Sequence, residues 1–360
     1  MKILVFPKDV NPYQDLLYSD ITDSNITVTY LKLLTSSHTL GLLSLPFQII
    51  MYRLKGYNIF HLHWLYTFQL TQTSKFFHNI FFKTFFSLYL LCFIAEIKFT
   101  GYKLVWTIHD ITPHERLFID DLFVTKIISS MADICIVHTN HIARQLLKLK
   151  ISHKKIKVIP HGSYTIQYKN NIERAQARSK VGLKDNDFTY LFLGQIREYK
   201  GIPELLKSFK KIIKLKSFTK LVIAGKCSDG TLKNLLDQAK IDMQDKLYLQ
   251  LSNIPDDDIQ IYMNAADVVV FPFRRVTTSG SLLLALSFGK PVIYPKEFFT
   301  ELPDNIGYGY ENVDDLPKIM ENAIHDTTLT QKGVNAKLYA DQFSWPEIAH
   351  ATLAVYNSLI

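Results

Sequence analysis

The chain has few cysteines, and this scarcity limits the kinds of site that it can build. Among 360 residues only Cys92, Cys135 and Cys227 occur, and no two of them have the spacing of a metal site. Cys135 and Cys227 lie in or beside apolar, strand-like runs, which is typical of buried thiols in a cytoplasmic protein. We therefore expect free thiols, no cysteine-ligated metal and a cytoplasmic location.

The aromatic-rich segment 75–98 lacks an uncharged run long enough to cross a membrane. Its longest such run, Thr84 to Ala95, has 12 residues, whereas a spanning helix needs about 20. The segment is either a core helix or a helix that presents Phe and Lys side chains to a membrane interface, and both hold if one face packs and the other docks. Met1-Lys2 leads directly into an apolar strand, so we expect no signal peptide.

Basic residues outnumber acidic ones, and the excess is concentrated in the first half of the chain. Lys and Arg number 41 against 33 Asp and Glu, with 17 against 10 in residues 1–165 and 24 against 23 in residues 166–360. A basic surface can bind nucleic acid or an anionic membrane. The basic runs are mostly short and no RNA-binding or zinc motif occurs. We therefore expect peripheral binding to the inner face of the plasma membrane, and no nucleic acid.

Strand-like apolar runs alternate with helix-length segments along the chain. The runs are short and rich in β-branched or aromatic residues, as in parallel strands that are buried on both faces. The alternation stops at a polar stretch, residues 163–178, and then starts again. We predict an α/β protein with two Rossmann-like domains, residues 1–165 and 166–342. A C-terminal helix follows in residues 343–360, and Ser344-Trp-Pro-Glu predicts a capping box at its start.

One stretch of the second half combines a strand with a candidate anion site. Residues 268–273 are apolar on both faces and predict a buried strand, and a helix follows over residues 282–288. Small residues stand where this helix must begin, namely Thr278, Ser279, Gly280 and Ser281. A hydroxyl there can cap the helix, and the free N–H groups of a helix N-terminus bind anions. The alternative is an ordinary β-α-β unit with a capped helix.

Polar and aromatic residues follow several predicted strands of the first half. The carboxyl ends of parallel strands form the edge at which α/β proteins bind ligands. The candidates at this edge are Asn11, Tyr13, His63, Trp64, His109 and Asp110. Capping and packing are the alternative roles for Asn11 and Tyr13. His61 and His63 share one face of a strand, but no third metal ligand is placed nearby, so we favour contact with a sugar.

Asp110 is the candidate general base. A carboxylate at a strand end can accept a proton from an attacking hydroxyl that lies within hydrogen-bond reach. Glu115, in the loop that follows, is the competing candidate. The alternative is that Asp110 caps the following turn.

Five stretches of the chain resemble, in order and spacing, sugar-nucleotide-dependent glycosyltransferases with the two-Rossmann (GT-B) fold. More narrowly, the chain looks like the bacterial family 4-type (group 1) enzymes that build surface polysaccharides. The stretches are NPYQDLLY (11–18), HLHW (61–64), WTIHDITPHE (106–115), FLGQIREYKG (192–201) and residues 278–291. The resemblance implies a deep cleft between the two domains and a C-terminal helix that crosses back to the first.

The resemblance also implies roles for particular residues. The second domain would bind the nucleotide diphosphate, with Arg197 and Lys200 neutralising it and the helix start at residues 278–281 holding the same phosphates. No metal or other cofactor would be needed. The first domain would bind the acceptor, and His109 matches a position that touches the donor sugar in relatives. The acceptor contacts would come from Asn11, Tyr13, His63 and Trp64.

Two departures from the family pattern leave the stereochemistry open. Many retaining relatives carry two glutamates eight residues apart, and these positions are Val276 and Leu284 here. The arginine that directly follows the first glycine of the family's loop is Gln195 here, with the cation displaced to Arg197. Inverting chemistry therefore remains an alternative. The candidate catalytic residues are Asp110, His109 and Glu115.

Together these features predict a hexosyltransferase. It would move a sugar from a UDP- or GDP-sugar to a lipid-linked saccharide, in exopolysaccharide, capsule or O-antigen assembly. Two alternatives stay open. The missing glutamates favour a catalytically degenerate glycan-binding or scaffold subunit, and the fold also suits a sugar-nucleotide epimerase, which would need more acidic residues.

Overall fold

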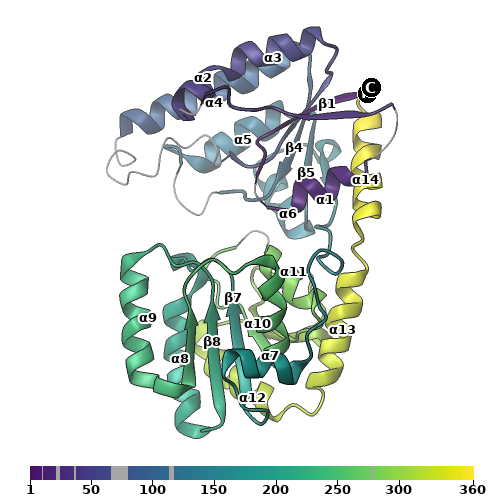
Figure 1. Ribbon diagram of the computed structural model, residues 1–360. Helices are drawn as coiled ribbons and strands as arrows, with labels where there is room; N and C mark the ends of the chain where they lie inside the picture. Colours follow the sequence, from purple (N-terminus) through teal and green to yellow (C-terminus); the bar gives the residue numbers. More distant parts are fainter. Residues whose placement is uncertain (10, 22–24, 36–37, 66–79, 113–116, 277–278) are drawn as a thin grey trace. The chain divides into compact units, whose positions relative to one another are not determined.

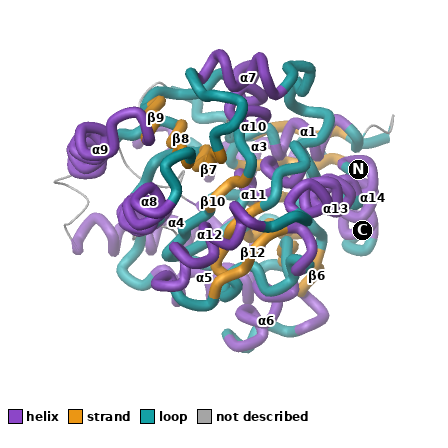
Figure 2. Tube along the Cα trace, turned by 90° about the horizontal axis from the view of Figure 1, so that it is seen from below, coloured by secondary structure: helices purple, strands orange, loops and turns teal. Residues whose placement is uncertain are grey.

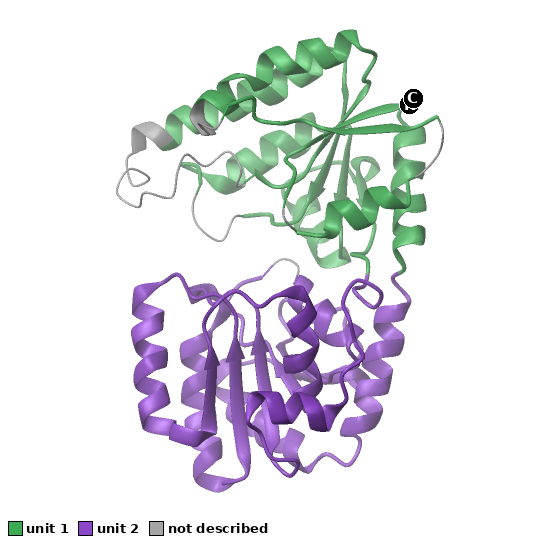
Figure 3. Cartoon of the chain, viewed as in Figure 1, with its two compact units in different colours: residues 1–162, 344–360 green, residues 163–343 purple. Residues whose placement is uncertain are grey.

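The computed structural model contains two compact units (Figure 3). Unit 1 comprises Met1–Gly162 and Ser344–Ile360, and unit 2 comprises Ser163–Phe343. The domain limits expected from the sequence, 165 and 342, lie within a few residues of these boundaries. The structure describes all residues except 10, 22–24, 36–37, 66–79, 113–116 and 277–278.

Unit 1 is built on a sheet of six parallel strands in the order β2-β1-β3-β4-β5-β6. The strands are β1 (Lys2–Phe6), β2 (Thr27–Tyr30), β3 (Ile59–Leu62), β4 (Lys103–Ile108), β5 (Ile134–Val137) and β6 (Ile156–Val158). The strand order changes direction between β1 and β3. In open α/β sheets, ligands bind beyond the carboxyl ends of the strands at such a switch point.

Helices cover both faces of this sheet (Figure 1). Successive strand residues point to opposite faces, so Leu4 and Phe6 join one core while Ile3 and Val5 join the other. The first core includes residues of α3 to α6, and the second includes residues of α1 and α14. The helices are α1 (Tyr13–Ser19), α2 (His38–Leu43), α3 (Leu45–Leu54), α4 (Ile80–Phe99), α5 (Asp121–Met131), α6 (Asn140–Lys148) and α14 (Trp345–Asn357). The packing of α14 in unit 1 confirms that the last helix returns to the first domain.

Unit 2 contains a second sheet of six parallel strands, in the order β12-β11-β10-β7-β8-β9. The strands are β7 (Phe188–Leu193), β8 (Thr219–Ala224), β9 (Leu247–Gln250), β10 (Val268–Val270), β11 (Val292–Pro295) and β12 (Gly307–Tyr310). The order changes direction between β7 and β10, as in dinucleotide-binding folds. The predicted α/β fold with two Rossmann-like domains is therefore confirmed.

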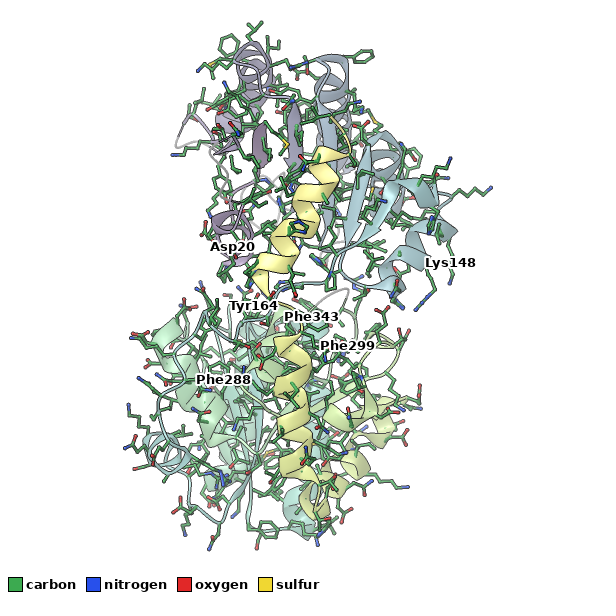
Figure 4. The ribbon with its side chains drawn as sticks, turned by 90° about the vertical axis from the view of Figure 1, so that its right-hand side faces the viewer. Asp20, Lys148, Tyr164, Phe288, Phe299 and Phe343 are labelled. Carbon is green, nitrogen blue, oxygen red and sulfur yellow. The ribbon has the colours of Figure 1, made fainter. Side chains whose placement is uncertain are left out.

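Seven helices of unit 2 flank this sheet among the residues described. They are α7 (Arg174–Val181), α8 (Ile202–Leu215), α9 (Gly230–Met243), α10 (Ile259–Ala265), α11 (Gly280–Ser287), α12 (Leu316–His325) and α13 (Leu329–Asp341). Figure 2 shows the strands between α8 and α9 on one side and α7 and α10 on the other. Helix α11, which ends next to Phe288, packs on α13, which ends shortly before Phe343 (Figure 4).

A buried ion pair ties α7 to the start of β10. The Arg178 guanidinium is almost fully buried and donates to the Asp267 carboxylate at 2.7 Å. It also donates to backbone carbonyls of the turn that follows α7, at 2.8 Å. Asp267 directly precedes β10, so this pair fixes the strand that leads to the candidate anion site. Removing one partner of such a pair costs about 3–5 kcal/mol.

Several elements depart from the sequence predictions. The patterns did not predict α5, α9, α12, α13 or β12, and β12 reads Gly-Tyr-Gly-Tyr without a β-branched residue. The prediction of a capping box at Ser344 is wrong, because the Ser344 side chain makes no cap hydrogen bond. Pro346 occupies the second helical position and lacks one of the N–H groups that a cap normally engages.

Two further findings concern membranes and thiols. Among the described residues, no helix combines the length and the apolar character that spanning a bilayer requires. All three cysteines are free, as expected; Cys135 is buried, Cys227 is half-buried and Cys92 is exposed.

Candidate functional site

The switch point of unit 2 brings the two predicted phosphate-binding segments together. β7 and β10 are hydrogen-bonded neighbours, and Arg197 and Lys200 follow the first strand while Ser279, Gly280 and Ser281 follow the second. A Cβ added to Gly194, the first residue after β7, would lie 3.8 Å from Cβ of Ser281. The end of β7 therefore lies against the start of α11.

The loop after β7 is held close to the loop after β10. Gly201 has φ +70°, and a Cβ there would lie 1.8 Å from the carbonyl oxygen of Pro272, so only glycine fits. The Arg274 N–H donates to the Tyr199 carbonyl at 2.9 Å. The Arg274 guanidinium pairs with Glu204 of α8 at 2.6 Å. These contacts fix the short 3₁₀ turn Glu198–Lys200.

Lys200 stands at the end of that turn. Its Nζ lies 4.4 Å from the ring centroid of Phe273 and 5.5 Å from that of Tyr199. A cation over an aromatic face is attracted by the ring and held there. Arg197 precedes the turn, and its carbonyl accepts the Lys200 N–H at 3.1 Å. The structure therefore places a fixed ammonium group beside the residues that follow β10.

The start of α11 is capped as predicted. The Ser279 Oγ accepts the Leu282 N–H at 3.1 Å and lies 3.1 Å from the Ser281 Oγ. The positive end of the helix dipole therefore stands at two small hydroxyl residues and Gly280, and the Tyr164 hydroxyl would lie 3.1 Å from a Cβ at Gly280. Thr278 lies outside the described residues. Gly289, with φ +65°, follows the end of the helix.

The positions of the two family glutamates are apolar and enclosed. Val276 and Leu284 are both 8% exposed. No carboxylate therefore stands at either position, and the candidate site presents small hydroxyls, backbone N–H groups and cations.

A cluster of histidines and aromatic rings forms the carboxyl edge of the sheet in unit 1. The Tyr13 ring is central, with centroid distances of 5.9 Å to His63, 4.9 Å to His109, 5.4 Å to His138 and 5.0 Å to His161. These four histidines follow β3, β4, β5 and β6. We call this group, with Tyr13, the histidine cluster.

Most of the predicted first-domain candidates lie in or beside this cluster. Trp64 stacks on His109 with centroids 4.2 Å apart and planes 14° apart. The Asn11 Oδ1 accepts the Tyr13 N–H at 2.9 Å, which is the capping role named above as the alternative for Asn11. Asp110 is half-buried directly after His109. Glu115 lies outside the described residues.

The sequence reasoning missed His138 and His161. The signal that selected His109, a polar residue directly after a strand, applies equally to His138, which follows β5. His138 donates from Nδ1 to the Ile159 carbonyl at 2.9 Å, and its Nε2 is buried without a hydrogen-bond partner among the described residues.

The histidine cluster is uncharged at neutral pH. Burial lowers the pKa of His138 to about 4 and that of His161 to about 3. Burial, with neighbouring imidazoles, lowers the pKa of His63 and of His109 well below the ordinary value. No set of three or more potential ligands in the described part of the chain is arranged to hold a metal ion. The cluster can therefore recognise a ligand by hydrogen bonds and ring contacts rather than by charge.

Comparison with known proteins agrees with this architecture. Residues 173–300 match the family "Glycosyl transferases group 1". The chain is similar to an uncharacterised glycosyltransferase of Methanocaldococcus jannaschii, with 26% identity over 56% of this chain and 54% of that protein. It is also similar to alpha-monoglucosyldiacylglycerol synthase of Streptococcus pneumoniae, with 28% identity over 57% of this chain and 48% of that protein. The chain thus spans about half the length of these two relatives.

A third relative and a solved structure match more of the chain. GDP-mannose:glycolipid 4-beta-D-mannosyltransferase of Xanthomonas campestris is 24% identical over 84% of this chain and 80% of its own length. The structure of HepE from Anabaena in complex with UDP has a TM-score of 0.74 at 17% identity, covering 99% of this chain and 100% of that one. The chain therefore has the GT-B fold, and its residues 173–300 match the group 1 glycosyltransferases.

Proposed function

We propose that the protein transfers a hexose from a UDP- or GDP-sugar to a lipid-linked saccharide. Unit 2 binds the nucleotide diphosphate and unit 1 binds the acceptor. The glycolipid named for the Xanthomonas relative and the UDP bound by HepE support these substrate classes. A place in exopolysaccharide, capsule or O-antigen assembly, at the inner face of the plasma membrane, is part of the same proposal.

The observation that carries the proposal is the geometry after β7 and β10. A diphosphate develops negative charge as the sugar leaves, and preorganised donors are most effective where that charge appears. The fixed Lys200 ammonium and the start of α11 supply a cation and free N–H groups on two adjacent loops. Arg197 adds a second cation to the first loop. We propose that these groups stabilise the negative charge on the departing diphosphate without a metal ion.

The experiment that tests this phosphate assignment replaces Lys200. Lys200→Ala should reduce transfer and donor hydrolysis about 100-fold or more, because a charge-assisted contact to the leaving group is lost. Lys207→Ala is the matched control, since Lys207 is an exposed lysine of α8. Both variants should keep the circular dichroism spectrum of the parent. Full turnover by Lys200→Ala would remove the phosphate assignment.

We further propose Asp110 as the general base of an inverting reaction. Val276 and Leu284 provide no carboxylate in unit 2, and Asp110 is a half-buried carboxylate at the ligand edge of unit 1. The apolar residues at 276 and 284 also fit the second candidate, a degenerate glycan-binding subunit. Calorimetric titration of UDP and GDP separates the two candidates, because a degenerate glycan-binding or scaffold subunit would bind neither nucleotide.

The membrane is the proposed partner of an apolar stripe on α2 and α3. Its residues recur every three or four positions, so they share one helical face, and each is about half exposed or more: Leu40, Leu43, Phe47, Ile50 and Leu54. The opposite face of α2 and α3 is in the core. Neighbouring α4 exposes Phe85, Leu88 and Phe99. An apolar face of this size in a unit with excess positive charge suits an anionic bilayer.

Vesicle flotation tests this surface. Phe47→Ser with Leu54→Ser should reduce binding to phosphatidylglycerol vesicles at least tenfold, because two bulky apolar side chains leave the interface. Ile241→Ser with Leu338→Ser removes exposed apolar residues from unit 2 and serves as the control. Equal binding by both double variants would contradict the proposal. A concentration-dependent dimer that only the first pair abolishes would show that a second copy covers the stripe instead.

A further inference from the structure

Hydrogen bonds join two tyrosines to three histidines in the interior of unit 1. Tyr18 of α1 and Tyr356 of α14 place their hydroxyls 2.7 and 2.5 Å from Nδ1 of His61. The Tyr18 hydroxyl also lies 3.1 Å from Nε2 of His63. Nδ1 of His63 in turn lies 3.3 Å from Nε2 of His109. The network therefore ends on a residue at the ligand edge of the sheet.

The direction of these bonds decides where His109 carries its proton. A neutral imidazole has one N–H donor and one acceptor nitrogen. Since burial keeps His63 and His109 neutral, one of them donates to the other. The two nitrogens of His63 must have opposite roles, because one donates and the other accepts. Whether Tyr18 donates to His63 or accepts from it therefore determines which of His63 and His109 donates to the other. If Tyr18 donates to His63, then His63 donates to His109.

The two phenols favour this direction. In this arrangement Tyr356 donates to Nδ1 of His61, which lies 2.5 Å from the Tyr356 hydroxyl. Tyr18 then donates to His63 at 3.1 Å, and His61 donates from Nε2 to the Thr107 Oγ1 at 2.8 Å. Each phenolic proton has its own nitrogen acceptor.

The reverse direction leaves one phenol poorly bonded. His63 would donate to Tyr18, and both phenols would compete for the single lone pair on Nδ1 of His61. The phenol that does not bond to this nitrogen would have only the other phenol as a partner, with the two hydroxyl oxygens 3.4 Å apart. Leaving a buried polar group without a good partner destabilises the folded protein, and this selects the first direction.

We propose that Tyr18 and His63 are positioning residues that hold His109 as the neutral tautomer with its proton on Nδ1. Nε2 of His109 accepts the His63 N–H, so the ring acts on its ligand as a hydrogen-bond donor. Trp64, stacked on the ring at 4.2 Å, limits its rotation. His109 then donates to a substrate oxygen and does not remove a proton. The identity of that substrate rests on the proposed function, whereas the tautomer does not.

Nitrogen NMR measures the tautomer without a substrate. In ¹⁵N-labelled protein at pH 7, two-bond correlations from the ring carbons' protons distinguish a protonated nitrogen from a bare one. We expect a protonated Nδ1 and a bare Nε2 on His109. A protonated Nε2, or a doubly protonated ring, would overturn the proposal.

A pair of matched variants tests the positioning role. Tyr18→Phe removes the hydroxyl that donates to His63. Tyr102→Phe removes another buried hydroxyl of unit 1, which donates to the Ile49 carbonyl at 3.0 Å and bonds no histidine. Tyr18→Phe should give mixed tautomers at His109 and lower kcat/KM for hydrolysis of UDP-glucose or GDP-mannose about tenfold, whereas Tyr102→Phe should change neither. Equal losses in the two variants would show a purely structural role and refute the assignment.

The two proposals fail in distinguishable ways. If the protein binds and hydrolyses neither sugar nucleotide, the proposed function fails, while the wild-type NMR spectrum still decides the tautomer. If it hydrolyses a sugar nucleotide but His109 carries its proton on Nε2, the positioning role alone is refuted. If Tyr18→Phe does not fold, the nitrogen spectrum of the wild-type protein still shows which nitrogen of His109 carries the proton.

Discussion

Gly201 should be among the most sensitive positions of unit 2, and Gly201→Ala is the substitution that shows why. The residue has φ +70°, which disfavours any L side chain. The added Cβ would also lie 1.8 Å from the carbonyl oxygen of Pro272, which is backbone and has little freedom to move. The two loops of the candidate phosphate site would therefore have to separate.

The expected loss combines two terms. The left-handed conformation costs about 1–2 kcal/mol, and forcing atoms into a filled site costs about 1–3 kcal/mol. We expect a total of about 3 kcal/mol, which lowers the Tm of a unit of this size by about 6–12 °C. Gly182→Ala is the control, because Gly182 has φ +81° in the same unit but its Cβ would meet only the Tyr248 side chain, at 3.4 Å.

Thermal unfolding can assign the loss to one unit. All three tryptophans, Trp64, Trp106 and Trp345, belong to unit 1, so tryptophan fluorescence follows unit 1 while circular dichroism follows both. Gly201→Ala should lower the circular dichroism transition by clearly more than Gly182→Ala does. Equal shifts in the two variants would refute the argument that the close approach to Pro272 requires glycine.

Two further predictions concern unit 1. Burial lowers the pKa of His138 from about 6.5 to about 4, so below pH 6.5 the unfolded chain binds a proton that the folded unit does not. Stability should therefore fall between pH 6.5 and 4, by about 3 kcal/mol for this residue alone, and a constant urea midpoint of the tryptophan transition would contradict this. Asp110→Asn should lower turnover at least about 100-fold with unchanged nucleotide affinity, and near-normal turnover would exclude Asp110 as the base.

Local chemistry predicted much of the fold. Val268 to Val270 reads as a strand buried on both faces, and Gly289 ends the following helix because glycine adopts φ +65° at little cost. β12 was missed because its Gly-Tyr-Gly-Tyr sequence has no strand pattern. A Cβ at Gly307 would lie 2.1 Å from the Val292 carbonyl, so close packing, not β propensity, selects this residue.

The candidate site was predicted in its parts but not in its connections. Strand ends identified Tyr13, His63 and His109, because parallel strands bring their carboxyl ends to one edge. The bond from Tyr18 to His63 joins residues 45 positions apart, and no local pattern encodes which nitrogen faces which hydroxyl. Tyr356 comes from the opposite end of the chain, so its bond to His61 follows from the return of α14 and not from sequence spacing.

The central proposal is that unit 2 binds a nucleotide diphosphate between Lys200 and the start of α11. Calorimetric titration of UDP and of GDP into the parent protein, Lys200→Ala and Lys207→Ala tests it most directly. We predict that one of the two nucleotides binds the parent and Lys207→Ala equally, and binds Lys200→Ala about 10- to 100-fold more weakly, because one charge-assisted contact of about 1.5–3 kcal/mol is lost. Equal affinity for all three proteins, or no binding of either nucleotide to the parent, would contradict the account.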